Sequence, residues 1–168
     1  YYQLGDIDQL KSATYEYMDW CRKYQRTRDR YMAWRQYIQR MTEKGMQEEA
    51  MAETVRLHQD AEQARDKYGL ACGEMCIGYN HRVFGNNVKL CIENYNNALK
   101  LFEEGSYYRD AYVVLLNIIQ TYLSRSEYAE AGEYLSKLSQ LEDELNRKQV
   151  DIDPSLHLRF CEFRVIGL

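Results

Sequence analysis

The residues of this chain that could do chemistry are three histidines, five cysteines and two acidic runs. His58, His81 and His157 are isolated, because none belongs to an H-x-x-x-H or H-E-x-x-H pattern. Cys72, Cys76 and His81 are spaced four and five residues apart, but a structural zinc site needs a fourth ligand and none is near in the sequence. We therefore predict no metal, no cofactor and no catalytic residues in this segment.

The acidic runs are QEEAMAE at 47–53 and LEDEL at 141–145. Paired carboxylates can act as general acid and base, yet these runs fall among lysines and arginines on the outer faces of expected helices, so we interpret them as solvated surface. The stretch GYNHRVFGNN at 78–87 has neither G-x-G-x-x-G nor G-K-[ST], so it encodes no phosphate-binding loop. We interpret Gly85 and the neighbouring asparagines as a turn.

The five cysteines, at 21, 72, 76, 91 and 161, cannot all pair with one another. Cys72 and Cys76 would share one helix face, where disulfide geometry is poor. We interpret all five as small buried hydrophobic residues. This favours a reducing compartment without excluding an oxidising one.

The composition is typical of helices. The 168 residues are 45% hydrophobic and include nine glycines and a single proline, which is poor in turn-forming residues. The net charge is −4 with acids and bases intermixed, which argues against a nucleic-acid partner. The longest apolar run, at 111–123, is too short to cross a bilayer, so membrane attachment would need parts outside this segment. Because the chain opens with YYQLGD and no Met, we expect it to be a piece of a longer protein.

Turn residues recur with a period near 40. Gly5, Gly45, Gly85 and Ser126 are spaced by 40, 40 and 41 residues. Residues at offsets 0, 3, 4 and 7 precede the last three turns and form one helical face, and small or apolar residues follow each turn. Each unit is therefore expected to be a helix, a tight turn and a second helix. The face residues are Trp34, Tyr37, Ile38 and Met41; Glu74, Ile77, Gly78 and His81; and Leu115, Ile118, Ile119 and Tyr122. The residues after the turns are Leu10, Thr14 and Tyr17; Ala50, Thr54 and Leu57; Cys91, Tyr95 and Ala98; and Ala131, Leu135 and Leu138.

Two stretches, WRQYIQRM…GMQEEAMAETVRL and LLNIIQTYLSRSEYAEAGEYLSKL, resemble the tetratricopeptide signature W-x2-L-G-x2-Y followed by A-x3-F. The resemblance covers essentially the whole chain and implies an all-α, right-handed α-solenoid of antiparallel helix pairs. The family period is about 34 residues, shorter than the one here, and Glu74 and His81 match their positions poorly. HEAT-type repeats, with periods of about 40–47 residues, are the alternative architecture.

On this pattern the chain is a single repeat array with units at about 1–26 (partial), 27–66, 67–106, 107–150 and 151–168 (partial). Pro154, after an acidic cap in DIDP, predicts the start of the last helix. That helix would belong to an incomplete repeat, so neighbouring repeats are expected on both sides.

In tetratricopeptide arrays the first helix of each pair lines a concave groove, and the resemblance assigns ligand contacts to its exposed positions. Such a groove would grade from polar and basic to apolar, which suits an extended peptide or a partner helix. The alternative is that neighbouring repeats cover the apolar end. The Lys and Asn clamp of chaperone adaptors is absent. The candidate contacts are Arg35, Gln39, Met75, Tyr79, Arg82, Leu116, Gln120 and Leu123.

Residues 95–145 also resemble the repeat regions of bacterial membrane-bound sensor histidine kinases and related transcriptional regulators. This implies a non-catalytic sensing or interaction segment that binds a protein or peptide within a larger signalling protein, placed outside the cytoplasmic membrane. One alternative is a structural scaffold or dimerisation array without a dedicated ligand. An enzyme is the third hypothesis.

Overall fold

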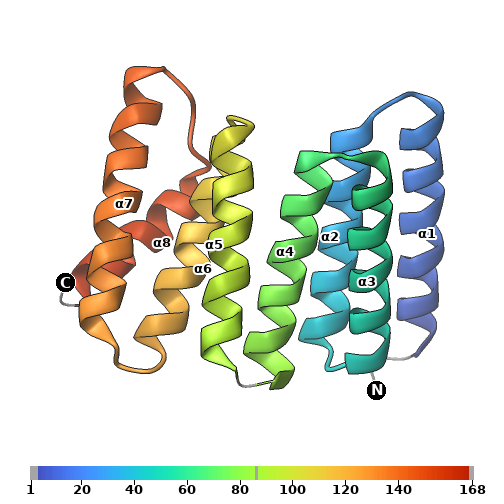
Figure 1. The fold of residues 1–168 in the computed structure, drawn as a ribbon, viewed down its shortest axis with the longest axis horizontal. Helices are drawn as coiled ribbons and strands as arrows, with labels where there is room; N and C mark the ends of the chain where they lie inside the picture. Colours follow the sequence, from blue (N-terminus) through green and yellow to red (C-terminus); the bar gives the residue numbers. More distant parts are fainter. Residues whose placement is uncertain (1–3, 86, 167–168) are drawn as a thin grey trace. The chain divides into compact units, whose positions relative to one another are not determined.

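The computed structural model describes residues 4–85 and 87–166, and it is helical throughout apart from short connections (Figure 1). This confirms the predicted all-α class, and no strand occurs in these two ranges. The chain divides into two compact units, Tyr1–Asn94 and Tyr95–Leu168. The helices are α1 (Leu4–Lys23), α2 (Thr27–Glu43), α3 (Gln47–Ala64), α4 (Lys67–Asn80), the π-helix η1 (His81–Gly85), α5 (Val88–Glu104), α6 (Tyr108–Leu123), α7 (Tyr128–Arg147) and α8 (Pro154–Val165).

Six helices end at a residue in the left-handed backbone conformation. In each turn the next N–H donates to the carbonyl five residues back, for example from Met46 to Met41 and from Glu127 to Tyr122, both at 3.0 Å. This Schellman arrangement satisfies carbonyls that a helix end leaves without partners. It confirms the predicted turns at Gly45 and Ser126 and adds turns of the same kind between successive pairs. The left-handed residues are Gln25, Gly45, Arg65, Ser106, Ser126 and Gln149.

Two predicted turn residues have a different role. Gly5 is the second residue of α1, so the prediction of a turn there is wrong. Gly85 is the last residue of η1, where the Asn87 N–H donates to the carbonyl of His81 at 3.2 Å. The asparagine between Gly85 and Asn87 lies outside the described residues. The first helix of this pair thus ends in a widened π-turn.

The π-turn accounts for an extra residue in the third repeat. The left-handed residues Gln25 and Arg65 are 40 positions apart, whereas Arg65 and Ser106 are 41 apart. A π-turn closes its hydrogen bond over one residue more than an α-turn does. η1 lies between Arg65 and Ser106, so it absorbs the added residue.

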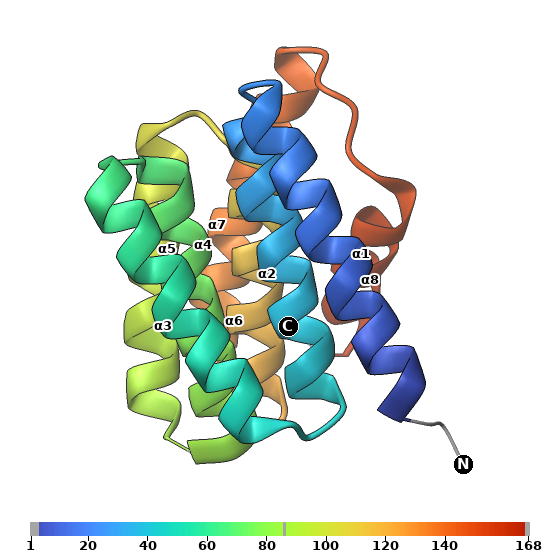
Figure 2. The ribbon, with the colours of Figure 1, turned by 90° about the vertical axis from the view of Figure 1, so that its right-hand side faces the viewer.

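In the first unit, α2 packs against α1, α3 and α4, and α3 also packs against α4 (Figures 1 and 2). The predicted apolar face of α2 is buried, including Trp34, Ile38 and Met41. A Cβ on Gly69 of α4 would lie 2.6 Å from the ring of Tyr31, so these helices approach too closely there for any side chain. Burying each large apolar side chain contributes about 1.5–3 kcal/mol, so the burial of this face stabilises the unit.

In the second unit, α6 packs against α7 and α8. Leu115, Ile118 and Ile119 of α6 are buried as predicted. Ala131 of α7 has 0% exposure, in agreement with its predicted place at a helix crossing. The face chosen from the 0, 3, 4, 7 spacing is therefore the core face of this helix.

The start of α8 also agrees with its prediction. Pro154 is in the first turn, where its missing N–H costs no hydrogen bond. The carboxylate of Asp153 accepts a hydrogen bond from the Ser155 N–H at 2.8 Å and caps the helix. This bond and the hydroxyl of Ser155 hold the pKa of Asp153 below its usual value.

Side chains about one period apart in the sequence contact one another within each unit. Five of these pairs join a helix to its counterpart in the next repeat. The sixth joins the first residue of α6, Tyr108, to the residue after α7, Lys148. Their sequence separations are 38, 40, 38, 38, 40 and 39 residues. They are Tyr15 with Glu53, Arg35 with Met75, Thr42 with Asn80, Asn96 with Tyr134, Tyr108 with Lys148, and Gln120 with Arg159.

Candidate interaction surface

Five of the predicted groove residues lie in the first unit, on α2, α4 and η1. Arg35 is half-buried and its Nη1 donates to the sulfur of Met75 at 3.1 Å. Met75 is only 7% exposed, so its side chain packs between helices and offers a partner little surface. The expectation that Met75 is an exposed contact is therefore corrected. Met75 instead accepts the hydrogen bond from Arg35 and so helps to position that side chain.

Tyr79 and Arg82 form the accessible part of this surface. The guanidinium of Arg82 lies 4.8 Å from the centre of the Tyr79 ring, and both side chains are half-buried. Such a cation–π pair holds the guanidinium in place while its outer N–H groups stay available. Gln39 of α2 is exposed and donates to Glu43 at 2.9 Å. We name Gln39, Tyr79 and Arg82 the α2–α4 surface.

A buried polar network lies beside this surface and was not predicted. The side-chain oxygens of Thr42 and Asn80 are 2.9 Å apart, and the Asn80 amide donates to Thr54 at 3.0 Å. The three residues come from α2, α4 and α3, and all are less than 9% exposed. A buried amide or hydroxyl without a hydrogen-bond partner destabilises the folded protein. This network therefore fixes the register of the three helices. Asn80 follows Tyr79 directly, so it also positions the α2–α4 surface.

The other three predicted contacts lie in the second unit. Leu116 is 0% exposed, so it belongs to the core, and the expectation of a groove contact there is corrected. Gln120 is exposed but accepts a hydrogen bond from Arg159 of α8 at 2.8 Å. Leu123 is half-buried at the end of α6. Helix α8 thus packs on α6, in line with the alternative that a following repeat covers this end.

One acid of each predicted solvated run is in fact buried. Glu53 is 4% exposed and accepts hydrogen bonds from Trp34, at 2.9 Å, and from Tyr15, at 2.8 Å. Burial and this carboxylate together raise the pKa of Tyr15. Glu142 is 8% exposed. The interpretation of both runs as wholly solvated is therefore wrong, although Glu48 is exposed as expected.

The histidines are less isolated than their spacing in the sequence indicates. His58 of α3 lies between two carboxylates, 3.7 Å from Glu62 and 3.6 Å from Glu74. Glu74 had been a poor match to the repeat pattern, and its contact with His58 supplies a polar partner at that helix crossing. His157 contacts Cys161, one turn away on the same helix, and also Glu142 of α7, which sequence spacing could not reveal.

Four of the five cysteines are buried, as predicted, and Cys161 is half-buried. Burial raises the pKa of the Cys76 thiol, so it resists ionisation. Within residues 4–85 and 87–166, no three His, Cys, Asp or Glu side chains are grouped so that they could hold a metal ion. None of the helices described is both long and apolar enough to cross a membrane.

In the first unit, the ring of Tyr79 and the guanidinium of Arg82 thus form an accessible pair next to a buried polar network, and the exposed amide of Gln39 lies on the adjoining helix α2. In the second unit, Leu116 on the equivalent face of α6 is buried and Gln120 is hydrogen-bonded to α8. Comparison of the chain with family models, with curated proteins and with solved structures finds no match.

Proposed function

We propose that this chain is part of a tetratricopeptide-like, right-handed α-solenoid of antiparallel helix pairs. The support is the left-handed turn that closes successive helices at intervals of about 20 residues, together with side-chain contacts between equivalent helices of successive repeats, at positions 38–40 residues apart. In a solenoid each repeat contacts only its neighbours, which requires contacts of this kind. Both helices of a pair are longer than in the family signature, which accounts for the longer period.

Its function in this proposal is to bind a protein or peptide at the α2–α4 surface. The observation that carries it is the cation–π pair of Arg82 and Tyr79, 4.8 Å apart, above the buried Thr42–Asn80 contact. A pre-organised guanidinium binds a carboxylate with little loss of side-chain entropy. The adjoining ring offers apolar contact, so the partner we expect is a segment with an acidic residue near an apolar one.

We further propose that this binding serves signalling, as in the bacterial sensor kinases and regulators that residues 95–145 resemble. A partner that fits one curvature of the array better than another shifts the population toward it. The proposal thus needs no catalytic residue in the chain itself.

The experiment selects binders from a displayed library of random peptides and measures their affinity by calorimetry. Replacing Tyr79 and Arg82 together by Ala should weaken binding at least tenfold without lowering the unfolding temperature. The matched control replaces Met51 and Val55 of α3 by Ala. These side chains are 49% and 53% exposed, and this variant should leave the affinity unchanged. Equal losses in the two double variants would exclude the α2–α4 surface as the binding site.

A scaffold without a dedicated ligand is the second candidate function. Burial of Leu116 and the bond from Arg159 to Gln120 favour it, because they fill the groove positions of α6 from within the chain. In that case the selected peptides should not share a pattern of an acidic residue near an apolar one.

A further inference from the structure

Two successive contacts connect a cysteine and a histidine of α8 with a glutamate of α7. The sulfur of Cys161 is 3.5 Å from Nε2 of His157, one helical turn earlier on α8. Nδ1 of the same imidazole is 2.5 Å from Oε1 of Glu142, on α7. This is the order nucleophile, base and orienting acid that activates thiols.

Burial of Glu142 determines which imidazole nitrogen carries the proton. The Glu142 side chain is 10% exposed, and a buried carboxylate needs a donor or a cation beside it. An ionised carboxylate only accepts hydrogen bonds, so Nδ1 of His157 is the donor to it. Nε2 of the neutral ring is then an acceptor and faces the thiol of Cys161.

Two further buried polar groups belong to this cluster. Oε2 of Glu142 and the hydroxyl of Tyr112, on α6, are buried and find no hydrogen-bond partner among the described residues. Burial, Glu142 and Cys161 all raise the pKa of Tyr112, so this phenol stays neutral. Glu162 follows Cys161 on α8. The cluster thus joins the phenol of α6 and the Glu142 carboxylate of α7 to the imidazole and thiol of α8.

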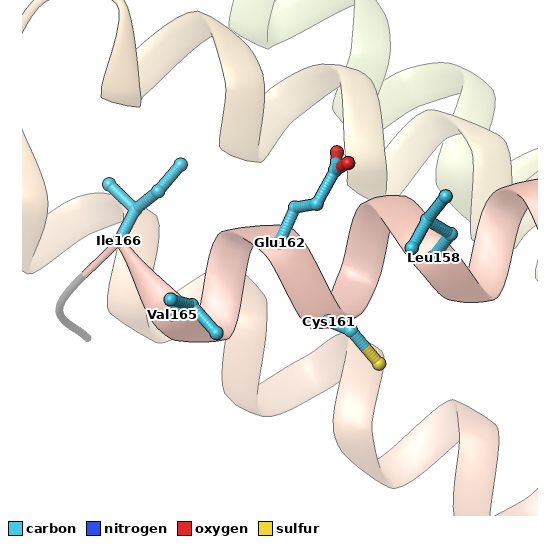
Figure 3. A pocket seen from close by; sticks show the side chains of 5 residues that line it. All are labelled: Leu158, Cys161, Glu162, Val165 and Ile166. Atoms are coloured by element: carbon cyan, nitrogen blue, oxygen red, sulfur yellow. The ribbon is translucent and has the colours of Figure 1, made fainter.

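Cys161 is also within reach of a small molecule. It lines an open apolar pocket of about 540 Å³ together with Leu158, Glu162, Val165 and Ile166 (Figure 3). Leu158 and Val165 are 58% and 85% exposed, so apolar surface lies on both sides of the sulfur along α8. The other four cysteines are buried.

We propose that Cys161 is a reactive thiol that exchanges with small apolar disulfides, positioned and activated by His157 and Glu142. The proton of the thiol moves to Nε2 of His157, and the thiolate attacks one sulfur of the disulfide. A bond forms between Sγ and that sulfur as the disulfide bond breaks. The departing thiolate takes the proton back from His157, so Cys161 is oxidised to a mixed disulfide and the reagent is reduced.

Disulfide exchange suits this site better than acyl transfer. Attack on a carbonyl builds an oxyanion that needs pre-organised donors, whereas the N–H groups around Cys161 are used within α8. Attack on a disulfide forms no oxyanion. The reaction is stoichiometric and reversible, so it adds redox sensitivity without making the chain an enzyme.

The test treats chain 1–168 with 4,4′-dithiodipyridine, a neutral aromatic disulfide, and follows thiopyridone release by absorbance. One rapid equivalent should map to Cys161 by peptide mass, and Cys161→Ser should abolish it. His157→Asn should slow this phase at pH 7 at least tenfold, and Glu142→Gln should slow it by a smaller factor. In the unfolded chain, all five cysteines should react at similar rates and release five equivalents of thiopyridone from the reagent.

The pH dependence separates activation from simple exposure. With His157 and Glu142 intact, the rate should stay nearly constant well below pH 8, whereas His157→Asn should show the profile of an ordinary thiol with a pKa of about 8.5. The same ordinary profile in the unaltered chain would overturn the proposal, even if a variant failed to fold. A rapid equivalent that maps to another cysteine would overturn it as well.

Discussion

The indole of Trp34 on α2 donates a 2.9 Å hydrogen bond to the carboxylate of Glu53 on α3. The same carboxylate accepts a hydrogen bond from Tyr15 of α1 at 2.8 Å, so it joins three helices. Arg56, one turn along α3, lies 3.0 Å away and supplies the opposite charge. A buried carboxylate with three donors is stable only while all of them stay in place.

Replacing Glu53 by Ala should therefore be costly. The change leaves the buried indole N–H of Trp34 without an acceptor, and we expect the free energy of unfolding to fall by about 3 kcal/mol. Urea unfolding followed by circular dichroism measures this loss. Glu48→Ala, at an exposed position on the same helix, should change the value by less than about 0.5 kcal/mol. Similar effects of the two changes would contradict the role given to Glu53.

The left-handed turn at Gln25 predicts a stabilising substitution. A non-glycine residue at a φ of 55° costs roughly 1 kcal/mol in Cβ crowding. Gln25→Gly should raise the free energy of unfolding by about 0.5–1 kcal/mol, reduced somewhat by the greater freedom of the unfolded chain. Gly45→Ala, at a φ of 74°, should have the opposite sign. Thermal unfolding of both variants checks the pair of signs.

Ala131 of α7 has no exposed surface, as expected for a small residue at a helix crossing. Leucine there would overpack the crossing and should lower stability by about 1–3 kcal/mol. Ala129, two residues earlier and exposed, provides the matched control, and Ala129→Leu should have little effect. Chemical unfolding of the two leucine variants distinguishes them, and an unchanged midpoint in Ala131→Leu would refute the assigned register.

Stability should fall in acid because of Asp60. Burial disfavours its charge, but hydrogen bonds from Arg30 and Tyr31 outweigh burial and lower its pKa. A lowered folded-state pKa stabilises the protein above the ordinary value near pH 4, and this stability is lost as the pH falls through the folded-state pKa.

Asp60→Asn tests this linkage directly. It should lower the free energy of unfolding by about 2 kcal/mol at pH 7 and flatten the decline of stability below about pH 4. Asp19→Asn removes an exposed pair with Arg22 and serves as the control. A decline in acid that is as steep without Asp60 as with it would place the sensitive group elsewhere.

Much of the fold followed from local patterns. The 0, 3, 4, 7 spacing identified the buried faces of α2 and α6, and the acidic cap before Pro154 identified the start of α8. These features depend on residues within one or two turns of each other. The turns at Gln25 and Arg65 escaped prediction because neither residue type favours a positive φ.

The candidate groove was harder to predict, because exposure depends on what packs above each residue. Met75 and Leu116 occupy groove positions by sequence, yet neighbouring helices leave them 7% and 0% exposed. Tyr79 and Arg82, by contrast, keep accessible surface at the end of α4. Periodicity identifies a helix face but not what lies over it.

Local patterns in the sequence established that the chain is helical, where α8 begins, where the turns at Gly45 and Ser126 lie, and which faces of α2 and α6 are apolar, because near neighbours along a helix set these properties. The burial of Glu53 next to an exposed Glu48, and the contact of His157 with Glu142, became known from the arrangement of the helices. Such differences arise between side chains on separate helices, so they depend on packing that no short sequence pattern contains.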